Sequence, residues 1–492
     1  MPGLELFSRG KVRDTFRLAD GLLLPVATDG ISIFDFVLNA LVPMKGVILN
    51  AMNHFWLKYL AGFGFDTHFV AAGADIDKYL PEPLRNNTDL QSRAIVVKEL
   101  KMADYEFVFR TCLTGSGLTA YKESGQVCGH KLPPGLQDGD ELPCILDTPT
   151  TKAEAGHDEP VLANSVRGLF PELNYRLCHI VQIAKTYAEK RGIKLADTKF
   201  EGDGTKVVLG DEVLTPDSSR FWDLREWQES RKPDKGRKAP SSLDKQLVRE
   251  WGKSMGIHQF DPKKPADVEA VHAMVVPDEI IRQTAQTYRY IFWRLTGMTI
   301  EQYLRDVMKV QVPELPPKNV LIICGSDADM PDVKLALDNP VVKANITKHV
   351  ISCHRNPMEV MDLIKSFERA DRLKKTLQRI GPVVEDSRQR FDVIIGVGSK
   401  ALALPGVIDA WAHHFKWNVR VAGVALGEPG SRALLAAQLA IEELPGQPVI
   451  INEMTGQAYT GSSGLRELLW RVDNGELPPL KPRKEKLVQL NV

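Results

Sequence analysis

The sequence predicts an α+β domain followed by an α/β domain that contains a parallel sheet. Three observations lead to this prediction. The chain has 492 residues, which is too many for one hydrophobic core. In the first part apolar and polar residues alternate, as in an antiparallel sheet with one face in water. After a proline-rich stretch the pattern changes to short, continuously apolar segments separated by helical ones, which indicates parallel strands buried on both faces.

In the first domain, LLLPVATD (22–29) and RAIVVKEL (93–100) have the pattern of strands. The segments from Leu49 to Tyr59 and from Ser165 to Arg191 have helical periodicity. We therefore expect residues 1–311 to form a twisted antiparallel sheet with helices packed against it.

The proline-rich stretch VPELPPK (312–318) is expected to be a linker, because prolines cannot pair within a central strand. We place the boundary near Pro316, the second domain at 319–475 and a C-terminal tail at 476–492. The charged stretch 368–390 is interpreted as an insertion before the third strand of the second domain. The strands expected there are NVLIICGS (319–326), KHVISCH (348–354), FDVIIGVGS (391–399), RVAGVAL (420–426) and PVIINE (448–453).

Composition excludes several classes of protein. The formal net charge is zero, so nothing global favours nucleic acid or an anionic membrane as a partner. The basic stretches 231–238 and 481–486 are interpreted as a solvated loop and a frayed tail. Six cysteines without a CxxC pair indicate reduced thiols rather than disulfides or a zinc site. The start resembles no signal peptide and no run of about 18 apolar residues occurs, so we expect a cytoplasmic protein.

Carboxylates gather on one predicted hairpin. Asp197, Lys199 and Glu201 alternate along a strand and therefore share a face. The turn GDGTK leads into VVLGDE (207–212), which should pair antiparallel and bring Glu201 close to Asp211. Two adjacent carboxylates repel unless a cation lies between them, and Mg²⁺ that bridges phosphates would resolve the conflict. The alternative is that these acids are merely exposed on a polar hairpin face.

Three segments carry groups suited to anions. SRGKVRD contains Gly10, Lys11 and Arg13, a glycine turn with two cations that lacks the P-loop pattern. Arg110 precedes a glycine-serine-glycine segment that opens a helix, and helix N-termini suit phosphate, although the serine is equally suited to be an N-cap. PDSSR adds two hydroxyls and Arg220. A long polar loop, TPTTKAEAGHDEP, completes the pattern.

Taken together, the ordered motifs RGKVRD, ATDGISIFD, VPMKG, TPTTKAEAGHDE, LADTKFE, GDEVLTPDSSRFW and LDKQLVREW resemble the SAICAR synthetase family over residues 5 to 300. The resemblance implies ATP-dependent ligation of L-aspartate to the ribotide CAIR, with Mg²⁺. The chain departs from the family's pattern at Gly30, where an arginine is usual, and at Thr111 and Cys112, where a glycine is usual. These departures bear on substrate affinity.

The resemblance also implies roles for individual residues. Glu201 and Asp211 would bind Mg²⁺, and Asp197 and Lys199 would line the catalytic pocket. The ATP-binding residues would be Gly10, Lys11, Val12, Arg13, Lys98, Leu100 and Met102. The substrate-binding residues would be Lys45, Gly46, Arg110, Gly115, Ser116, Ser219, Arg220, Asp244 and Lys245.

Polar residues also follow the predicted strands of the second domain. Ser326, His354 and the glycine-rich segment GVGSKALALPG each follow a strand, and parallel strands end at one sheet edge, where such folds bind ligands. A single histidine is often structural, but His354 lies beside Arg355, which favours a functional role.

The motifs GSDAD, SCHRNP and ALPG make residues 319–473 resemble the PurE-type family of N5-CAIR mutases and AIR carboxylases. This implies a flavodoxin-like three-layer fold that forms CAIR from N5-CAIR or from AIR and CO2. Ser326, Asp329 and Arg355 would bind the ribotide, and His354 would move the proton. Ser399, Lys400 and Ala403 depart from the family's glycine loop.

Two alternatives stay open. The first is that the second domain is degenerate and serves only as a scaffold, since PurE-type domains assemble as octamers and a homo-oligomer is implied either way. A kinase-like phosphotransferase is disfavoured, because no HRD motif followed by DFG occurs.

Overall fold

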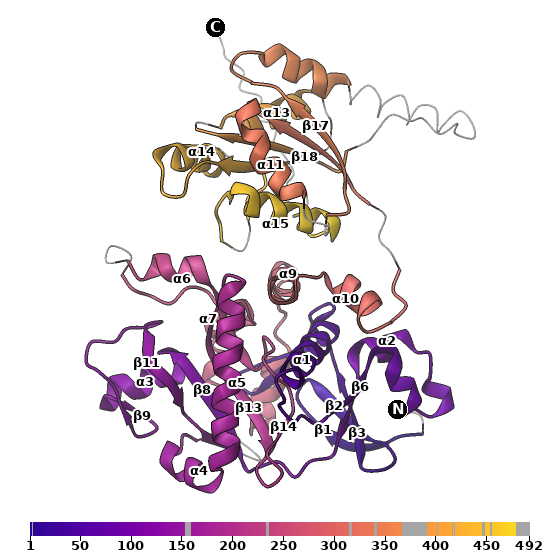
Figure 1. Cartoon of the computed structure of the whole chain (residues 1–492), viewed down its shortest axis with the longest axis vertical. Helices are drawn as coiled ribbons and strands as arrows, with labels where there is room; N and C mark the ends of the chain where they lie inside the picture. The colour runs from indigo at the N-terminus through magenta and orange to yellow at the C-terminus, as the bar shows by residue number, and fades with distance from the viewer. Residues whose placement is uncertain are drawn as a thin grey trace. The chain divides into compact units, whose positions relative to one another are not determined.

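The computed structural model divides the chain into two compact units, Met1–Pro313 and Glu314–Val492 (Figure 1). The charged stretch 368–390, the basic stretch 481–486 and the centre of the polar loop, 153–158, lie outside the described residues. The structure describes residues 1, 3–152, 159–232, 236–313, 317–338, 342–366, 391–400, 402–415, 417, 419–444, 448–452 and 455–478.

The first sheet of the first unit is antiparallel and has five strands in the order β1-β2-β3-β7-β6. Leu24 of β3 and Val96 of β7 are fully buried in its core, so the strands predicted around 22–29 and 93–100 are confirmed. The strands are β1 (Glu5–Arg9), β2 (Arg13–Arg17), β3 (Leu22–Ala27), β6 (Phe69–Ala72) and β7 (Ile95–Lys98), with a separate hairpin of β4 (Gly30–Ile33) and β5 (Phe36–Leu41).

The second sheet carries the residues of greatest interest. Its central strand, β13 (Ile193–Asp203), pairs antiparallel with β8, β14 and β15. Glu201 lies opposite Gly210, so the predicted hairpin is confirmed. The other strands are β8 (Tyr105–Cys112), β11 (Glu141–Asp147), β12 (Thr150–Thr151), β14 (Val208–Gly210) and β15 (Ser219–Asp223), and a small hairpin joins β9 (Gln126–Val127) to β10 (His130–Lys131).

Helices pack around both sheets. The helix predicted at 165–191 is two helices, because Pro171 cannot donate the backbone hydrogen bond that would continue the first one. Pro171 instead occupies the first turn of the second helix, where no donor is needed. The helices are α1 (Lys45–Ala61), α2 (Thr88–Arg93), α3 (Gly115–Ser124), α4 (Ala163–Leu169), α5 (Pro171–Lys190), α6 (Leu224–Ser230), α7 (Gln246–Ser254), α8 (Pro265–His272), α9 (Asp278–Thr296) and α10 (Ile300–Asp306).

The second unit is built on a parallel sheet, as predicted, in the order β17-β16-β18-β19-β20. Helices α11 and α15 pack on one face of the sheet, and α13 and α14 pack on the other (Figure 1). The elements are β16 (Asn319–Cys324), α11 (Met330–Leu337), β17 (Asn345–Val350), β18 (Val393–Ser399), α13 (Leu404–His414), β19 (Arg420–Leu426), α14 (Arg432–Glu442), β20 (Tyr459–Thr460) and α15 (Gly461–Asp473).

Two strand predictions in the second unit are wrong. Within the described residues 448–452 one parallel bridge forms, between Ile450 and Ala422, and Asn452 instead pairs with Gln457. The short strand β20 takes the outer position instead. β17 begins and ends earlier than 348–354 and lies at the sheet edge, so it is half-exposed rather than buried on both faces.

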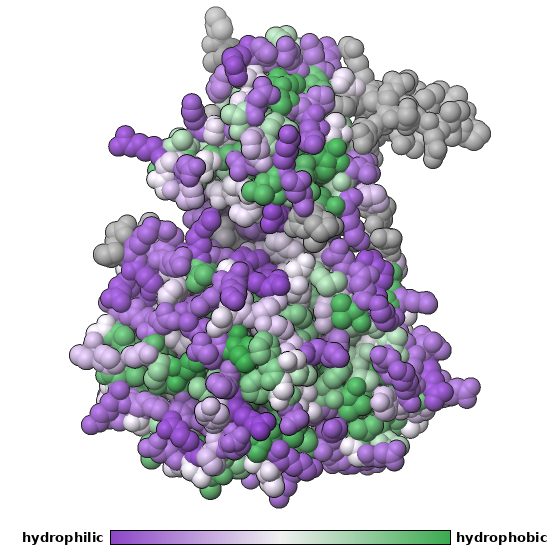
Figure 2. Space-filling model, in the orientation of Figure 1, coloured by the Kyte–Doolittle hydropathy of each residue, from purple (hydrophilic) through white to green (hydrophobic). Residues whose placement is uncertain are grey.

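The surface agrees with the composition in most respects. On the face shown in Figure 2, apolar side chains form small groups among polar ones. Across the described ranges, no helix is both long enough and apolar enough to cross a bilayer. All six cysteines are free, as expected. The interpretation of 231–238 as a solvated loop is wrong for Arg231, whose side chain is 16% exposed and donates to the buried carboxylate of Asp140 at 2.9 Å. Arg237 is exposed, as expected, and donates to the same carboxylate.

A buried carboxylate joins four elements of the first unit. Asp147 at the end of β11 accepts hydrogen bonds from Arg167 of α4 at 2.6 Å, Asn174 of α5 at 3.2 Å and the ring of His130 at 3.0 Å. Burial alone would raise the pKa of Asp147, but hydrogen bonding and the charge of Arg167 lower it below its ordinary value. The folded state therefore prefers the ionised carboxylate.

Asp147→Asn is expected to lower the free energy of unfolding by about 1.5–3 kcal/mol at pH 7, because hydrogen bonds to a charged group are lost. Since the folded pKa is depressed, this contribution is present above the unfolded value near pH 4 and is lost as the pH falls below it. Urea denaturation at pH 7 and pH 3.5 checks this. A difference between wild type and variant that stays constant over this range would contradict it.

Candidate functional site

Strand β13 presents a row of charged side chains on one face. Asp197, Lys199 and Glu201 occupy alternate positions, as predicted, and each has an oppositely charged partner on a neighbouring segment. Lys199 pairs with Glu106 of β8, and Glu201 pairs with Lys152. The row therefore spans five residues, from Asp197 at one end to the Glu201 carboxylate at the other.

Two arginines converge on Asp197. Arg110 of β8 and Arg220 of β15 each donate to Asp197 Oδ2 at 3.0 Å, because both residues lie directly opposite Asp197 in the sheet. Arg110 also donates to Ser116 Oγ at 3.0 Å. Burial lowers the pKa of Arg110, and the charge of the neighbouring Arg220 lowers it further. The two arginines carry two positive charges, whereas Asp197 between them carries one negative charge. This excess of positive charge suits a phosphate.

Helix α3 closes this group, which we call the arginine cradle (Arg110, Ser116, Asp197 and Arg220). A Cβ on Gly115, whose φ is +56°, would lie 3.0 Å from the Arg220 guanidinium, so only glycine permits the approach. Ser219 lies beside the cradle, but its hydroxyl is engaged by Thr198 Oγ1 at 2.8 Å. The structure thus brings the predicted residues Arg110, Gly115, Ser116 and Arg220 together and places Ser219 next to them.

A carboxylate pair lies at the other end of the row. Asp211 follows Gly210 with a left-handed φ of +54°, a conformation that a non-glycine residue rarely adopts outside functional or strained positions. Burial raises the pKa of Glu201 and the charge of Asp211 raises it further. Burial also opposes ionisation of Asp211, but the charges of Arg13 and Lys199 lower its pKa overall. The charge of Asp211 therefore acts on the Glu201 carboxylate.

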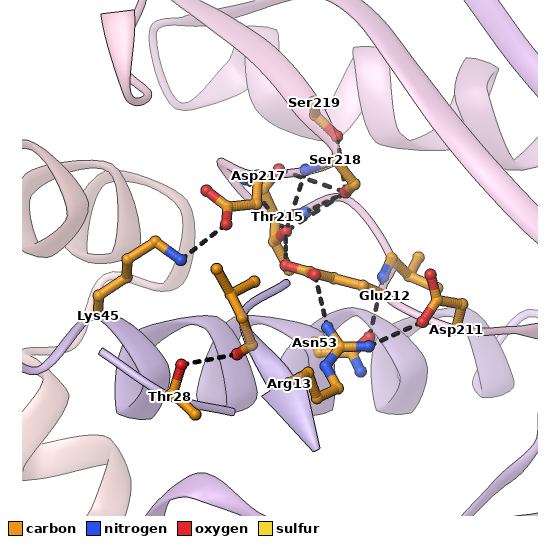
Figure 3. Close-up of polar contacts among 12 residues, drawn as sticks. Arg13, Thr28, Lys45, Asn53, Asp211, Glu212, Thr215, Asp217, Ser218 and Ser219 are labelled. Carbon is orange, nitrogen blue, oxygen red and sulfur yellow. Dashed lines mark hydrogen bonds and ion pairs between the residues drawn. The ribbon is translucent and has the colours of Figure 1, made fainter. Parts of the chain in front are cut away.

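Arg13 lies between two acids of this segment (Figure 3). Its guanidinium donates to Asp211 Oδ1 at 2.7 Å and to Glu212 Oε2 at 2.5 Å. The part of the chain that the structure describes contains no group of three or more His, Cys, Asp or Glu side chains suited to a metal ion. Two carboxylates fit Mg²⁺, which is commonly held by one or two carboxylates together with substrate phosphates.

The glycine turn between β1 and β2 places its two cations differently. Gly10 N donates to Arg13 O at 2.8 Å, and a Cβ on Gly10 would lie 2.9 Å from that oxygen. The carbonyl of Val12 accepts from Thr28, which fixes the turn. Arg13 then points to Asp211, whereas Lys11 is exposed and pairs with Asp35 at 2.5 Å.

The connection between the two sheets packs on the hairpin of β13 and β14. Lys98 ends β7 and is exposed, while Leu100 and Met102 are half-buried. A Cβ on Gly210 would lie 3.3 Å from Leu100 and would overlap the end of the Met102 side chain, so a larger residue there would require Met102 to move. Leu100 and Met102 therefore lie immediately beside the residue that precedes Asp211.

A second charged group is buried near the start of α1. Lys45, fully buried, pairs with Asp217 at 2.7 Å, and Tyr288 of α9 donates to the same carboxylate at 2.5 Å (Figure 3 shows Lys45 and Asp217). Lys245 lies 3.9 Å away. Burial would raise the pKa of Asp217, but Lys245 and Lys45 hold it well below its ordinary range. Beside them Asp244 accepts from Ser242 at 2.9 Å.

Lys45→Met is expected to lower the free energy of unfolding by about 3–5 kcal/mol, because it leaves the buried Asp217 carboxylate short of a partner. Urea denaturation measures the change, with the exposed Lys206→Met as the matched control. Adding Asp217→Asn to Lys45→Met should recover part of the loss. A loss below about 1 kcal/mol, as for a surface pair, would contradict the expectation.

Sequence reasoning missed five charged or polar members of these groups. Glu212 and Asp217 lie in the same motif as Asp211 and Arg220, and Lys152 lies in the polar loop, so local signals existed for them. Glu106 and Tyr288 carried no such signal, because their partners are 93 and 71 positions away in the chain.

In the second unit the predicted residues share one sheet edge but are only partly in contact. Ser326 donates to Asp329 Oδ2 at 3.0 Å, and Asp329 is buried beside Gly398. His354 and Arg355 are exposed in the turn after β17, and the described contacts include no hydrogen bond or ion pair from their side chains to Asp329. Lys400 follows β18 with φ +62° and is exposed.

The fold and site of the first unit define a class: an α+β protein with an arginine cradle for an anion and a neighbouring carboxylate pair suited to a divalent cation. The model of the SAICAR synthetase family matches residues 6–263. The chain belongs to the SAICAR synthetase family, which functions in purine biosynthesis.

Individual relatives agree with this assignment. The phosphoribosylaminoimidazole-succinocarboxamide synthase of Methylobacillus flagellatus is 40% identical over 306 residues, which cover 60% of this chain and 95% of that protein. The protein of the same name from Maridesulfovibrio salexigens is 37% identical over 61% of this chain and 96% of its own length. The solved Saccharomyces cerevisiae SAICAR synthase complexed with SAICAR is 33% identical, with TM-score 0.52 over 61% of this chain and 97% of its own.

Proposed function

We propose that the first unit ligates L-aspartate to CAIR with ATP, giving SAICAR, ADP and phosphate. The observation that carries the proposal is the layout of β13, which has the arginine cradle at Asp197 and a carboxylate pair at Glu201 and Asp211. Such a layout fits a substrate that has a phosphate at one end and a carboxylate to be activated at the other. The family and the names of its members support the same reaction.

The chemistry follows from the weakness of a carboxylate as an acyl donor. Transfer of the ATP γ-phosphoryl group to the CAIR carboxylate forms an acyl phosphate. The aspartate amine then attacks the acyl carbon, loses a proton, and phosphate leaves. Mg²⁺, held by Glu201 and Asp211, would supply positive charge to the phosphate oxygens. Positioning and electrostatics provide most of the catalysis in such transfers.

We assign the side chains to these steps as follows. The arginine cradle, with Gly115 and Ser219 beside it, holds the ribotide phosphate, and Asp197 and Lys199 orient the reacting groups. The nucleotide phosphates lie at the turn from Gly10 to Arg13. The adenine lies at Lys98, Leu100 and Met102, and the substrate side is closed by Lys45, Asp244 and Lys245.

An assay with single omissions tests this proposal. Purified chain with CAIR, L-aspartate, ATP and Mg²⁺ should form SAICAR and ADP in equal amounts, and omission of any one component should stop SAICAR formation. Sustained ADP release without aspartate would favour the kinase-like phosphotransferase instead.

For the second unit we propose that it forms CAIR from AIR and CO2 or from N5-CAIR. The parallel sheet and the contact between Ser326 and Asp329 at its carboxyl edge support a ligand site there. Ser326, Asp329 and Arg355 would bind the ribotide, and His354 would transfer the proton on the imidazole carbon. The full chain and its His354→Asn variant, supplied with AIR and labelled bicarbonate or with N5-CAIR, test the assignment.

The alternative for the second unit is a scaffold that assembles the chain into a homo-oligomer. Loss of CAIR formation in His354→Asn without a change in oligomer size would favour the catalyst. No CAIR formation by the wild-type chain, together with an oligomer, would favour the scaffold. Free thiols at all six cysteines are consistent with the reducing cytoplasm, where we place the protein.

A further inference from the structure

Lys152 lies in the polar loop, and the proposed function assigns it no role. Its backbone is fixed, because Thr150 and Thr151 pair with β8 and Lys152 N donates to Asp104 O at 3.3 Å. From there its ammonium reaches Glu201 Oε2, with which it forms an ion pair. The Lys152 side chain is 43% exposed, whereas the Glu201 side chain is 11% exposed.

Each member of the carboxylate pair, Glu201 and Asp211, already has a positively charged side chain as its partner. Lys152 offsets Glu201, and Arg13 offsets Asp211. Arg13 also holds Glu212 at 2.5 Å, so it keeps a partner if Asp211 turns to another ligand. In the ranges that the structure describes, Glu201 is the one acid paired with Lys152. Lys199, the nearest other cation on β13, is engaged by Glu106.

A divalent cation and the Lys152 ammonium would compete for the same oxygens. Lys152 contacts Glu201 Oε2, so a cation that coordinates this oxygen uses lone pairs close to the ammonium, and the ion's two charges repel it. An arriving ion therefore weakens or displaces the contact with Lys152. The phosphates that accompany such an ion are anions, so the displaced ammonium has a new partner close by.

We propose that Lys152 is a positioning residue that competes with the divalent cation for Glu201. It holds the carboxylate in the cation-free protein and releases it when the cation binds. This inference rests on the function proposed for the first unit, in which Glu201 and Asp211 bind the cation.

Mn²⁺ titration of the full chain without nucleotide, followed by electron paramagnetic resonance, tests the competition. Lys152→Met should tighten Mn²⁺ binding about two- to fivefold, the factor that a partly exposed ion pair is worth. Lys152→Arg should restore the wild-type affinity. Lys190→Met is the matched control, since it removes an equal charge from the exposed end of α5 and should leave the affinity unchanged.

A double-variant cycle separates this inference from the proposed function. In a Glu201→Gln background, Lys152→Met should have no effect, because the contested carboxylate is gone. Unchanged or weaker Mn²⁺ binding in Lys152→Met would overturn the competition alone. If Glu201→Gln instead bound Mn²⁺ as tightly as the wild type, the cation site would be overturned, and with it both proposals.

Discussion

Asp211→Asn is expected to reduce SAICAR formation by about 10²–10³-fold or more, without affecting the CAIR formation that we propose for the second unit. The variant keeps the size of the side chain but removes one of the two charges that would hold the divalent cation. It also removes the charge that Asp211 presents to Arg13, which keeps Glu212 as its partner. Steady-state assays with CAIR, aspartate and ATP measure the loss.

A matched control for this variant is Asp66→Asn, whose side chain is 78% exposed. It makes the same chemical change near the start of β6 and should leave turnover within twofold of the wild type. Circular dichroism spectra should agree for all three proteins. If Asp211→Asn kept more than a tenth of the wild-type turnover, the placement of the cation at this residue would be wrong.

Arg220→Ala is expected to raise the KM for CAIR about 10- to 100-fold, with little change in the KM for ATP. The estimate corresponds to the 1.5–3 kcal/mol of hydrogen bonds to a charged group. Arg220 reaches Asp197 and the start of α3 but contacts none of the residues assigned to ATP. Initial rates over separate concentration series of CAIR and ATP measure the two constants.

Arg9→Ala, at a side chain that is 73% exposed on β1, serves as the control for the loss of an arginine. Its KM values should match those of the wild type. An equal rise in the KM for ATP in Arg220→Ala would contradict the assignment of the arginine cradle to the ribotide phosphate.

The sequence predicts the site best where the contributing residues are close in the chain. Glu201 and Asp211 are joined by one hairpin, so a period-2 pattern and a turn signal were enough to place them together. Both domain classes were predictable for a similar reason, since each depends on the apolar pattern within short segments: alternating in the first domain and continuous in the second. The break at Pro171 was also visible in the sequence, and a proline inside a helical pattern should have divided the predicted helix.

Contacts between distant segments could not be predicted in this way. Lys45 reaches Asp217 across 172 positions, and nothing near either residue shows that they pair. Lys11 and Arg13 lie two positions apart, yet they point to different partners, because the turn at Gly10 ends before Arg13 enters β2. Neither the strand pattern nor the charge of these residues carries that information.

One member of the arginine cradle, Asp197, and one member of the carboxylate pair, Glu201, lie on the same strand, β13. Asp197 and Glu201 are four positions apart, or about 13 Å of extended backbone, so in the proposed function β13 would set the distance between the two ends of the ligand. Inserting one residue between them would turn one end of the row toward the opposite face of the sheet. Substrates of a different length should therefore be accommodated by changes in α3 or in the β14–β15 segment, while the length of β13 stays fixed.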